Sequence, residues 1–189
     1  AYFGLITYLD EKIGNILNVL EETGLADDTV VIYTSDHGEM AGEHGLWRKM
    51  SFYEQSSKIP MQISWPKMLP RNLRLDLVAS NVDLVATILD LAGVETENWK
   101  FDGDSLIPKI QNSKNKWKNY AFAEHLAHGT DAPRAMLRKD HWKICYTHKA
   151  IPELELYNLK EDPGEFNNLA NMEITRTIQE NLVSTAPNA

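Results

Sequence analysis

With 189 residues, the chain is long enough for one domain, or for one domain and a small appendage. Its formal net charge of −8 disfavours nonspecific binding to nucleic acid or to an anionic membrane, because the overall field repels phosphates, and no apolar run is long enough to span a bilayer. The only cysteine, Cys145, excludes an internal disulfide bond and fits a reducing compartment such as the cytoplasm, although a periplasmic location stays open.

The first part of the chain predicts a helix followed by a strand. Apolar residues recur at three- and four-residue spacings from Phe3 to Leu20, which is typical of one apolar helical face, and Gly24 ends the helix. Residues 29–34 then form a continuous apolar run, which predicts a strand buried on both faces of a parallel sheet. A natural protein seldom begins inside a helix, so we expect the chain to be part of a longer protein.

A second strand and a second helix follow. Residues 58–66 predict the strand, which ends at a proline. The apolar periodicity of residues 81–93 predicts a short helix. Asn81 and Asp83 are the candidate N-caps of this helix, and Gly93 ends it.

The pattern changes after a polar connector. Short alternating runs indicate an antiparallel sheet with a hairpin near residues 139–140, and a last helix is expected at about residues 172–183. The sequence therefore predicts an α/β fold in two parts. Residues 1–115 form an α/β region, and residues 116–189 form a small antiparallel β subdomain with a terminal helix.

An acid and a histidine follow the predicted strand at 29–34. Ligands bind at the carboxyl ends of strands in α/β folds, and Asp36 and His37 carry two groups that ligate divalent cations. Gly38 lets the backbone turn sharply, so both side chains could face one point. The alternative is that Asp36 caps a loop and His37 is merely exposed.

A lysine lies thirteen residues after Asp36. The ammonium of Lys49 offers three donors and a point charge, which suits an oxyanion whose charge develops in a transition state. The alternative is a solvated loop lysine. The adjacent Arg48 cannot project in the same direction from an extended chain, so we expect it to be structural or to face solvent.

The run SDHGEMAGEHGLWRKMSFYEQSSKIPMQISWP, residues 35–66, resembles the sulfatase family of the alkaline phosphatase superfamily, and choline-sulfatase-type members most closely. The segments DLVATILDLAGV, DGDSLIP, EHLAHGTDAPRAMLRKDHWKICY and ELYNLKEDPGEFNNLA follow in the order of that family. The resemblance covers nearly all of the chain. It implies part of an alkaline-phosphatase-like α/β/α sandwich, followed by a small antiparallel sheet with a C-terminal helix. It also implies a sulfuric ester hydrolase that cleaves a small sulfate monoester to an alcohol and sulfate.

The resemblance assigns roles to three residues. Asp36 and His37 match two ligands of the family's divalent cation, for which Ca²⁺ is expected and Mn²⁺ or Mg²⁺ are alternatives. Lys49 matches the lysine that contacts the sulfate. His44 stands where we expect an arginine in the closest relatives, so it receives no role.

The family's nucleophile, a formylglycine made in a C/S-x-P-S/A-R motif, has no match. Cys145 fails because Thr147 and Lys149 stand in place of the proline and the arginine, and Ser64 is followed by Pro66 but not by the rest of the motif. The family's other two metal carboxylates are also missing. The resemblance therefore implies the C-terminal portion of a sulfatase, inactive alone, which associates with the missing N-terminal half or with further copies of itself.

Two other functions remain open. Asp36, His37 and Lys49 would equally suit a phosphonate or phosphate ester hydrolase of the same superfamily, although the segment GLWRKMSF favours a sulfatase. A noncatalytic chain that keeps the fold for binding is the third possibility. A nucleophile motif upstream would decide between an enzyme and a binding chain.

Two further groups of residues could select the substrate's alcohol. One is an aromatic set that could hold a quaternary ammonium by cation–π contact, comprising Trp47, Phe52 and Tyr53. The other lies where the resemblance places the mouth of the active site, comprising Glu124, His125 and His128. Core packing for the first set and an ordinary surface strand for the second are the readings that we favour.

Overall fold

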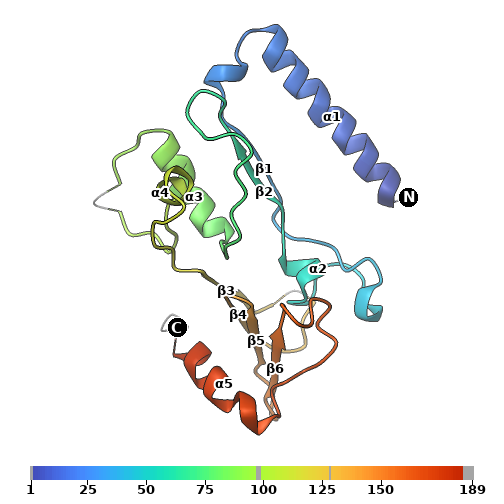
Figure 1. Ribbon diagram of the computed structural model, residues 1–189. Helices are drawn as coiled ribbons and strands as arrows, with labels where there is room; N and C mark the ends of the chain where they lie inside the picture. Colours follow the sequence, from blue (N-terminus) through green and yellow to red (C-terminus); the bar gives the residue numbers. More distant parts are fainter. Residues whose placement is uncertain (1, 97–98, 128, 185–189) are drawn as a thin grey trace. The chain divides into compact units, whose positions relative to one another are not determined.

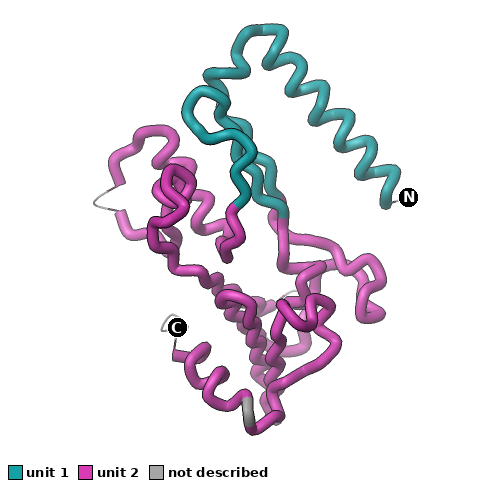
Figure 2. Tube along the Cα trace, in the orientation of Figure 1, with its two compact units in different colours: residues 1–34, 60–74 teal, residues 35–59, 75–189 magenta. Residues whose placement is uncertain are grey.

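The computed structural model describes residues 2–96, 99–127 and 129–184 (Figure 1). The chain divides into two compact units, coloured separately in Figure 2. Unit 1 comprises Ala1–Thr34 and Pro60–Arg74, and unit 2 comprises Ser35–Ile59 and Leu75–Ala189. The domain boundary that the sequence predicts near residue 115 stays a prediction.

Unit 1 consists of one long helix and a two-stranded ribbon. Helix α1 (Tyr2–Glu22) ends as predicted at Gly24, whose φ of +70° is the left-handed conformation of a helix C-terminus. A 3₁₀ turn η1 (Ala26–Asp28) leads into β1 (Val31–Thr34). No residue of α1 is buried, because this unit has only one narrow ribbon to lay against it. Among the described residues, no helix is long and apolar enough to cross a membrane.

The two strands of unit 1 run antiparallel. β1 pairs with β2 (Met61–Ser64) from Val31 opposite Ser64 to Thr34 opposite Met61. The prediction that residues 29–34 form a fully buried strand in a parallel sheet is therefore wrong for the described chain, in which β1 is half-exposed. A continuous apolar run indicates a strand but does not encode the direction of its neighbour.

Unit 2 contains the antiparallel sheet that the sequence predicts. The sheet has the order β3–β4–β5–β6, in which each strand pairs antiparallel with the next. Its strands are β3 (Tyr120–His125), β4 (Arg134–Lys139), β5 (Trp142–Thr147) and β6 (Glu153–Asn158). Asp140, with a φ of +51°, closes the β4–β5 hairpin at the predicted place.

One face of this sheet packs on the last helix. The core cluster joins Leu137 of β4, Ile144 of β5 and Leu156 of β6 to Leu182. Leu182 belongs to α5 (Arg176–Val183), which follows a 3₁₀ turn η3 (Glu173–Thr175) near the predicted position of the terminal helix. The mixed α/β composition, the antiparallel sheet and the C-terminal helix confirm the predicted fold class.

The other face of β5 is also covered. Lys143, Cys145 and Thr147 alternate with the core residues and are buried as well. Burial raises the pKa of the Cys145 thiol, which is therefore an unreactive packing group. Buried side chains therefore lie on both faces of β5, while Tyr146 is exposed.

Short helices complete unit 2. They are η2 (Glu43–Gly45), α2 (Glu54–Ser57), α3 (Asn81–Leu91) and α4 (Ile107–Gln111), of which only α3 was predicted. The predicted N-caps of α3 are corrected, because Ser80 is the cap. Asp83 completes a capping box by accepting the Ser80 N–H at 2.9 Å.

Candidate functional site

The candidate site begins at His37, whose tautomer is fixed by its neighbour. The ring Nδ1 lies 2.7 Å from the carbonyl oxygen of Gly38. A carbonyl only accepts, so Nδ1 carries the proton, and in the neutral ring Nε2 presents a lone pair. This is the state in which an imidazole binds a metal.

Two charged groups converge on that Nε2 atom. The ammonium of Lys49 lies 2.7 Å from it, and Asp36 Oδ2 lies 3.4 Å from it. The structure thus brings together the three residues that the sequence singled out. His37 is 37% exposed and Asp36 80% exposed at the side chain, so the cluster is open to a ligand.

The carboxylate of Asp36 is oriented by local hydrogen bonds. Its Oδ1 accepts the His37 N–H at 2.9 Å and the Ser35 hydroxyl at 3.3 Å. Desolvation raises the pKa of Asp36, but hydrogen bonds from the His37 amide and the Ser35 hydroxyl lower it, and the pKa lies below its ordinary value. Asp36 is therefore ionised at neutral pH, as a metal ligand must be.

Glycine is required at position 38 because the backbone of Gln55 leaves no room for a side chain, and not because the chain turns sharply there. A Cβ atom at this position would lie 2.0 Å from the carbonyl oxygen of Gln55, and Gly38 is not one of the residues with positive φ. Its N–H donates to the Ser56 carbonyl at 2.7 Å. The Asp36–His37–Gly38 segment therefore lies directly against α2.

The loop between His37 and Lys49 closes on itself. Met40 N–H donates to the Arg48 carbonyl at 2.8 Å, and Glu39 Oε1 accepts the Arg48 N–H at 2.5 Å. These bonds return the chain so that Lys49 faces His37. Arg48 has a φ of +69° and an exposed side chain, which agrees with the expectation that it faces solvent.

Asp36 and His37 fit part of a site for a divalent cation. The 3.4 Å between Asp36 Oδ2 and His37 Nε2 suits two atoms that share one Ca²⁺, whose ligands lie at about 2.3–2.6 Å. Lys49 donates to the same lone pair and would have to turn aside, which its flexible stem permits. Within residues 2–96, 99–127 and 129–184, no group of three or more His, Cys, Asp and Glu side chains could hold a metal ion.

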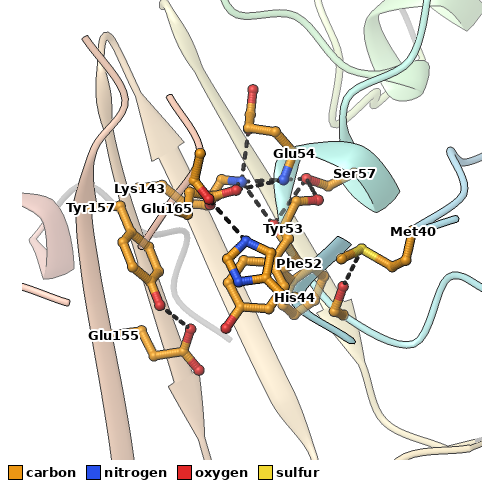
Figure 3. A network of polar contacts seen from close by, with 12 residues as sticks. Met40, His44, Phe52, Tyr53, Glu54, Ser57, Lys143, Glu155, Tyr157 and Glu165 are labelled. Carbon is orange, nitrogen blue, oxygen red and sulfur yellow. Dashed lines mark hydrogen bonds and ion pairs between the residues drawn. The ribbon is translucent and has the colours of Figure 1, made fainter. Parts of the chain in front are cut away.

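A buried lysine that was not predicted from the sequence lies close to the loop (Figure 3). Lys143 of β5 pairs with Glu54 at 2.7 Å and with Glu165 at 2.8 Å. Its ammonium also donates to the Phe52 carbonyl at 2.7 Å. The available signal was its position, since Lys143 shares one face of β5 with Cys145.

The other residues considered from the sequence have packing contacts. His44, which received no role, stacks on Tyr53 with ring centroids 4.0 Å apart and donates through Nε2 to the Gly164 carbonyl at 2.8 Å (Figure 3). Phe52 lies edge-on to His125. The predicted aromatic pocket stays a prediction, and its Trp47 is 72% exposed. The second group also stays a prediction, because Glu124 is exposed and His128 lies outside the described residues.

Comparison with known proteins decides the family. The family described as "N-sulphoglucosamine sulphohydrolase, C-terminal" matches residues 42–187. The chain belongs to the sulfatases. This confirms the resemblance seen in the sequence, including the alkaline phosphatase superfamily.

Individual relatives agree with this assignment. A choline-sulfatase of Rhizobium meliloti is 39% identical over 173 residues, which are 90% of this chain and 32% of that protein. A solved structure of a complex with the substrate D-glucosamine-2-N,6-O-disulfate is 31% identical, with a TM-score of 0.87, over 95% of this chain and 37% of the other. A phosphonate monoester hydrolase from Silicibacter pomeroyi is 30% identical, with a TM-score of 0.83, over 97% of this chain and 38% of the other. This sulfatase chain spans about a third of the length of the relatives that it matches.

Proposed function

We propose that the protein carrying this chain hydrolyses a sulfate monoester to an alcohol and sulfate. The observation that carries the proposal is the convergence of Asp36 Oδ2 and Lys49 Nζ on His37 Nε2 in a member of the sulfatase family. The arrangement combines two metal-ligating groups with a cation that can hold an oxyanion.

The roles divide between the three residues. Asp36 and His37 would bind a divalent cation, with Ca²⁺ favoured and Mn²⁺ or Mg²⁺ as alternatives. When bound, the cation would supply Lewis-acid polarisation of the sulfuryl oxygens. Lys49 turns from His37 to donate to a sulfuryl oxygen, and it stabilises negative charge there as the ester bond breaks. The formylglycine nucleophile would come from another segment of the protein.

A phosphonate or phosphate ester hydrolase is the second candidate. It is favoured by the 30% identity to the phosphonate monoester hydrolase, and the same three side chains would serve it. Among sulfate esters, choline sulfate is the substrate that we favour, on the basis of the 39% identity to the choline-sulfatase. A sulfated amino sugar is the competing substrate, because a structural relative binds one.

The test is a substrate panel with the full-length protein. Choline sulfate, D-glucosamine-2-N,6-O-disulfate, an aryl sulfate and a phosphonate monoester are compared by release of sulfate or phosphonate. We expect a sulfate ester to be hydrolysed fastest, and the activity to depend on an added divalent cation. Faster phosphonate hydrolysis would favour the second candidate. A folded protein that hydrolyses none of the four would favour a noncatalytic binding chain.

A further inference from the structure

Both halves of the candidate site rest on α2, the single-turn helix Glu54–Ser57. The carbonyl of Ser56 accepts the Gly38 N–H at 2.7 Å, and its hydroxyl donates to the Lys49 carbonyl at 2.9 Å. Ser56 is 3% exposed, so water does not compete for these bonds. A displacement of α2 therefore alters the separation between His37 and Lys49.

Helix α2 is too short to hold its own position. It has four residues and lacks a side-chain cap, whereas isolated helices shorter than about 12 residues are marginal in water. Its first amide, Glu54 N–H, donates to Glu165 Oε2 at 2.6 Å. The carbonyl of Phe52, just before the helix, accepts from Lys143 Nζ at 2.7 Å. The start of α2 is thus fixed by two side chains from distant parts of the chain.

Lys143 is the centre of these contacts (Figure 3). Its ammonium pairs with Glu54 Oε1 and Glu165 Oε1, and it lies 3.5 Å from the Ser57 hydroxyl. The side chain is fully buried, so it does not contact a substrate. β5 is paired on both sides, with β4 and β6, and therefore holds the lysine rigidly.

The charges around Lys143 balance. Arg138 lies opposite Lys143 across β4 and β5, and its guanidinium interacts electrostatically with the carboxylates of Glu54 and Glu165. Burial raises the pKa of Glu165, while the charge of Lys143 opposes that shift. Loss of the lysine charge would leave two carboxylates repelling each other in a buried setting, and the bond from Glu165 to α2 would weaken.

We propose that Lys143, with Glu54 and Glu165, is a positioning group that fixes α2 to the sheet and thereby sets the separation between the Asp36–His37 pair and Lys49. The catalytic consequence rests on the proposed function, whereas the structural consequence does not. A misplacement of reacting groups by about 1 Å lowers the rate on the order of 10²-fold, so loss of this positioning should lower the rate measurably.

The decisive variant is Lys143→Met in the full-length protein, because methionine fills a similar volume without the charge. We expect kcat to fall on the order of 10- to 100-fold with a much smaller change in KM. Amide hydrogen exchange should accelerate in peptides covering residues 36–57 and stay unchanged in peptides covering β3. Ile144→Val is the matched control. It changes the next residue of β5 on the opposite, core face, and it should lower the unfolding temperature without altering kcat or exchange at residues 36–57.

Two results would overturn the proposal. One is exchange in Lys143→Met that accelerates evenly across the protein, since the lysine would then only stabilise the fold. The other is exchange at residues 36–57 that matches the unmodified protein. If Lys143→Met does not fold, Ser56→Ala and Glu165→Gln replace it, and unchanged exchange at residues 36–57 in both would equally overturn the proposal. Exchange is measured without catalysis, so an unmodified protein that hydrolyses no sulfate ester would contradict only the proposed function.

Discussion

At the scale of single residues, the neighbours of His37 decide which ring nitrogen carries the proton and which groups face the other. The Gly38 carbonyl holds the proton on Nδ1, which leaves Nε2 to face Asp36 and Lys49. The sequence could indicate these residue types and their order. It could not give the contact between Lys49 and His37, because that contact depends on how the loop from Glu39 to Arg48 closes.

Substitutions of Asp36 and Lys49 should separate binding from catalysis in the full-length protein. Asp36→Ala should lower both metal content and rate, because a ligand is removed. Lys49→Ala should retain the metal and lower kcat by about 10²–10³-fold, the scale for one lost oxyanion contact. Metal analysis and steady-state kinetics on both variants check this. Equal loss of metal in the two would show that Lys49 does not have the assigned role.

Gly38 should not tolerate a methyl group. The Cβ of Gly38→Ala would meet the Gln55 carbonyl at 2.0 Å, so we expect a loss of about 1–3 kcal/mol of folding free energy, the range for overpacking. Gly14→Ala is the control. It lies in α1 with open space around it, and it should stabilise the helix by about 0.5–1 kcal/mol. Chemical denaturation of both variants measures the difference, and an unfolding midpoint for Gly38→Ala equal to that of the unmodified protein would contradict the packing.

At the scale of elements, the sequence predicted correctly those strands whose partners are their neighbours along the chain. Alternation predicted β3 to β6 because each strand pairs with the next, and Asp140 marked the hairpin. The direction of β2 against β1 and the partners of Lys143 were not predictable, since both depend on segments far away along the chain.

A separate prediction concerns Ser80, the N-cap residue of α3. Ser80→Ala should destabilise the fold by about 1 kcal/mol, because the hydroxyl no longer caps the helix while Asp83 loses part of its capping box. Ser80→Thr keeps the hydroxyl and should retain most of the stability. Thermal unfolding of the two variants side by side checks this, and equal unfolding temperatures would show that the hydroxyl contributes nothing.

At the scale of the whole molecule, the most conspicuous feature is the apolar surface of unit 1. Exposed fractions on α1 reach 82% at Phe3, 63% at Ile16 and 50% at Leu9. A groove of 1090 Å³ runs between this helix and the ribbon, lined among others by Ile13, Tyr33 and Ile63. Exposed apolar surface of this extent is typical of interaction sites.

The 189-residue chain alone should therefore self-associate. Light scattering should detect dimers or larger species, and the double variant Leu9→Ser/Ile16→Ser should reduce them. Ile151→Ser serves as control, because Ile151 is equally apolar and 83% exposed but lies in unit 2. A monodisperse monomer with one cooperative unfolding transition would contradict this prediction.

The same chain, purified alone, should release no sulfate from choline sulfate or an aryl sulfate. It lacks the C/S-x-P-S/A-R motif, and its described residues gather no three metal ligands. The comparison is with a blank and with the Lys49→Ala chain. Turnover that exceeds the blank and disappears in Lys49→Ala would contradict the prediction.

During synthesis, the residues of the candidate site are added well before Lys143, because Lys143 lies far from α2 along the chain. Lys143 follows Phe52 by 91 residues, and a ribosome adding 5–20 residues per second takes roughly 5–20 s to cover them. In that interval Asp36, His37 and Lys49 have been made, but the lysine that holds their support has not. A nascent chain released before Lys143 is added would carry Asp36, His37 and Lys49, but it would lack the lysine that fixes α2 to the sheet.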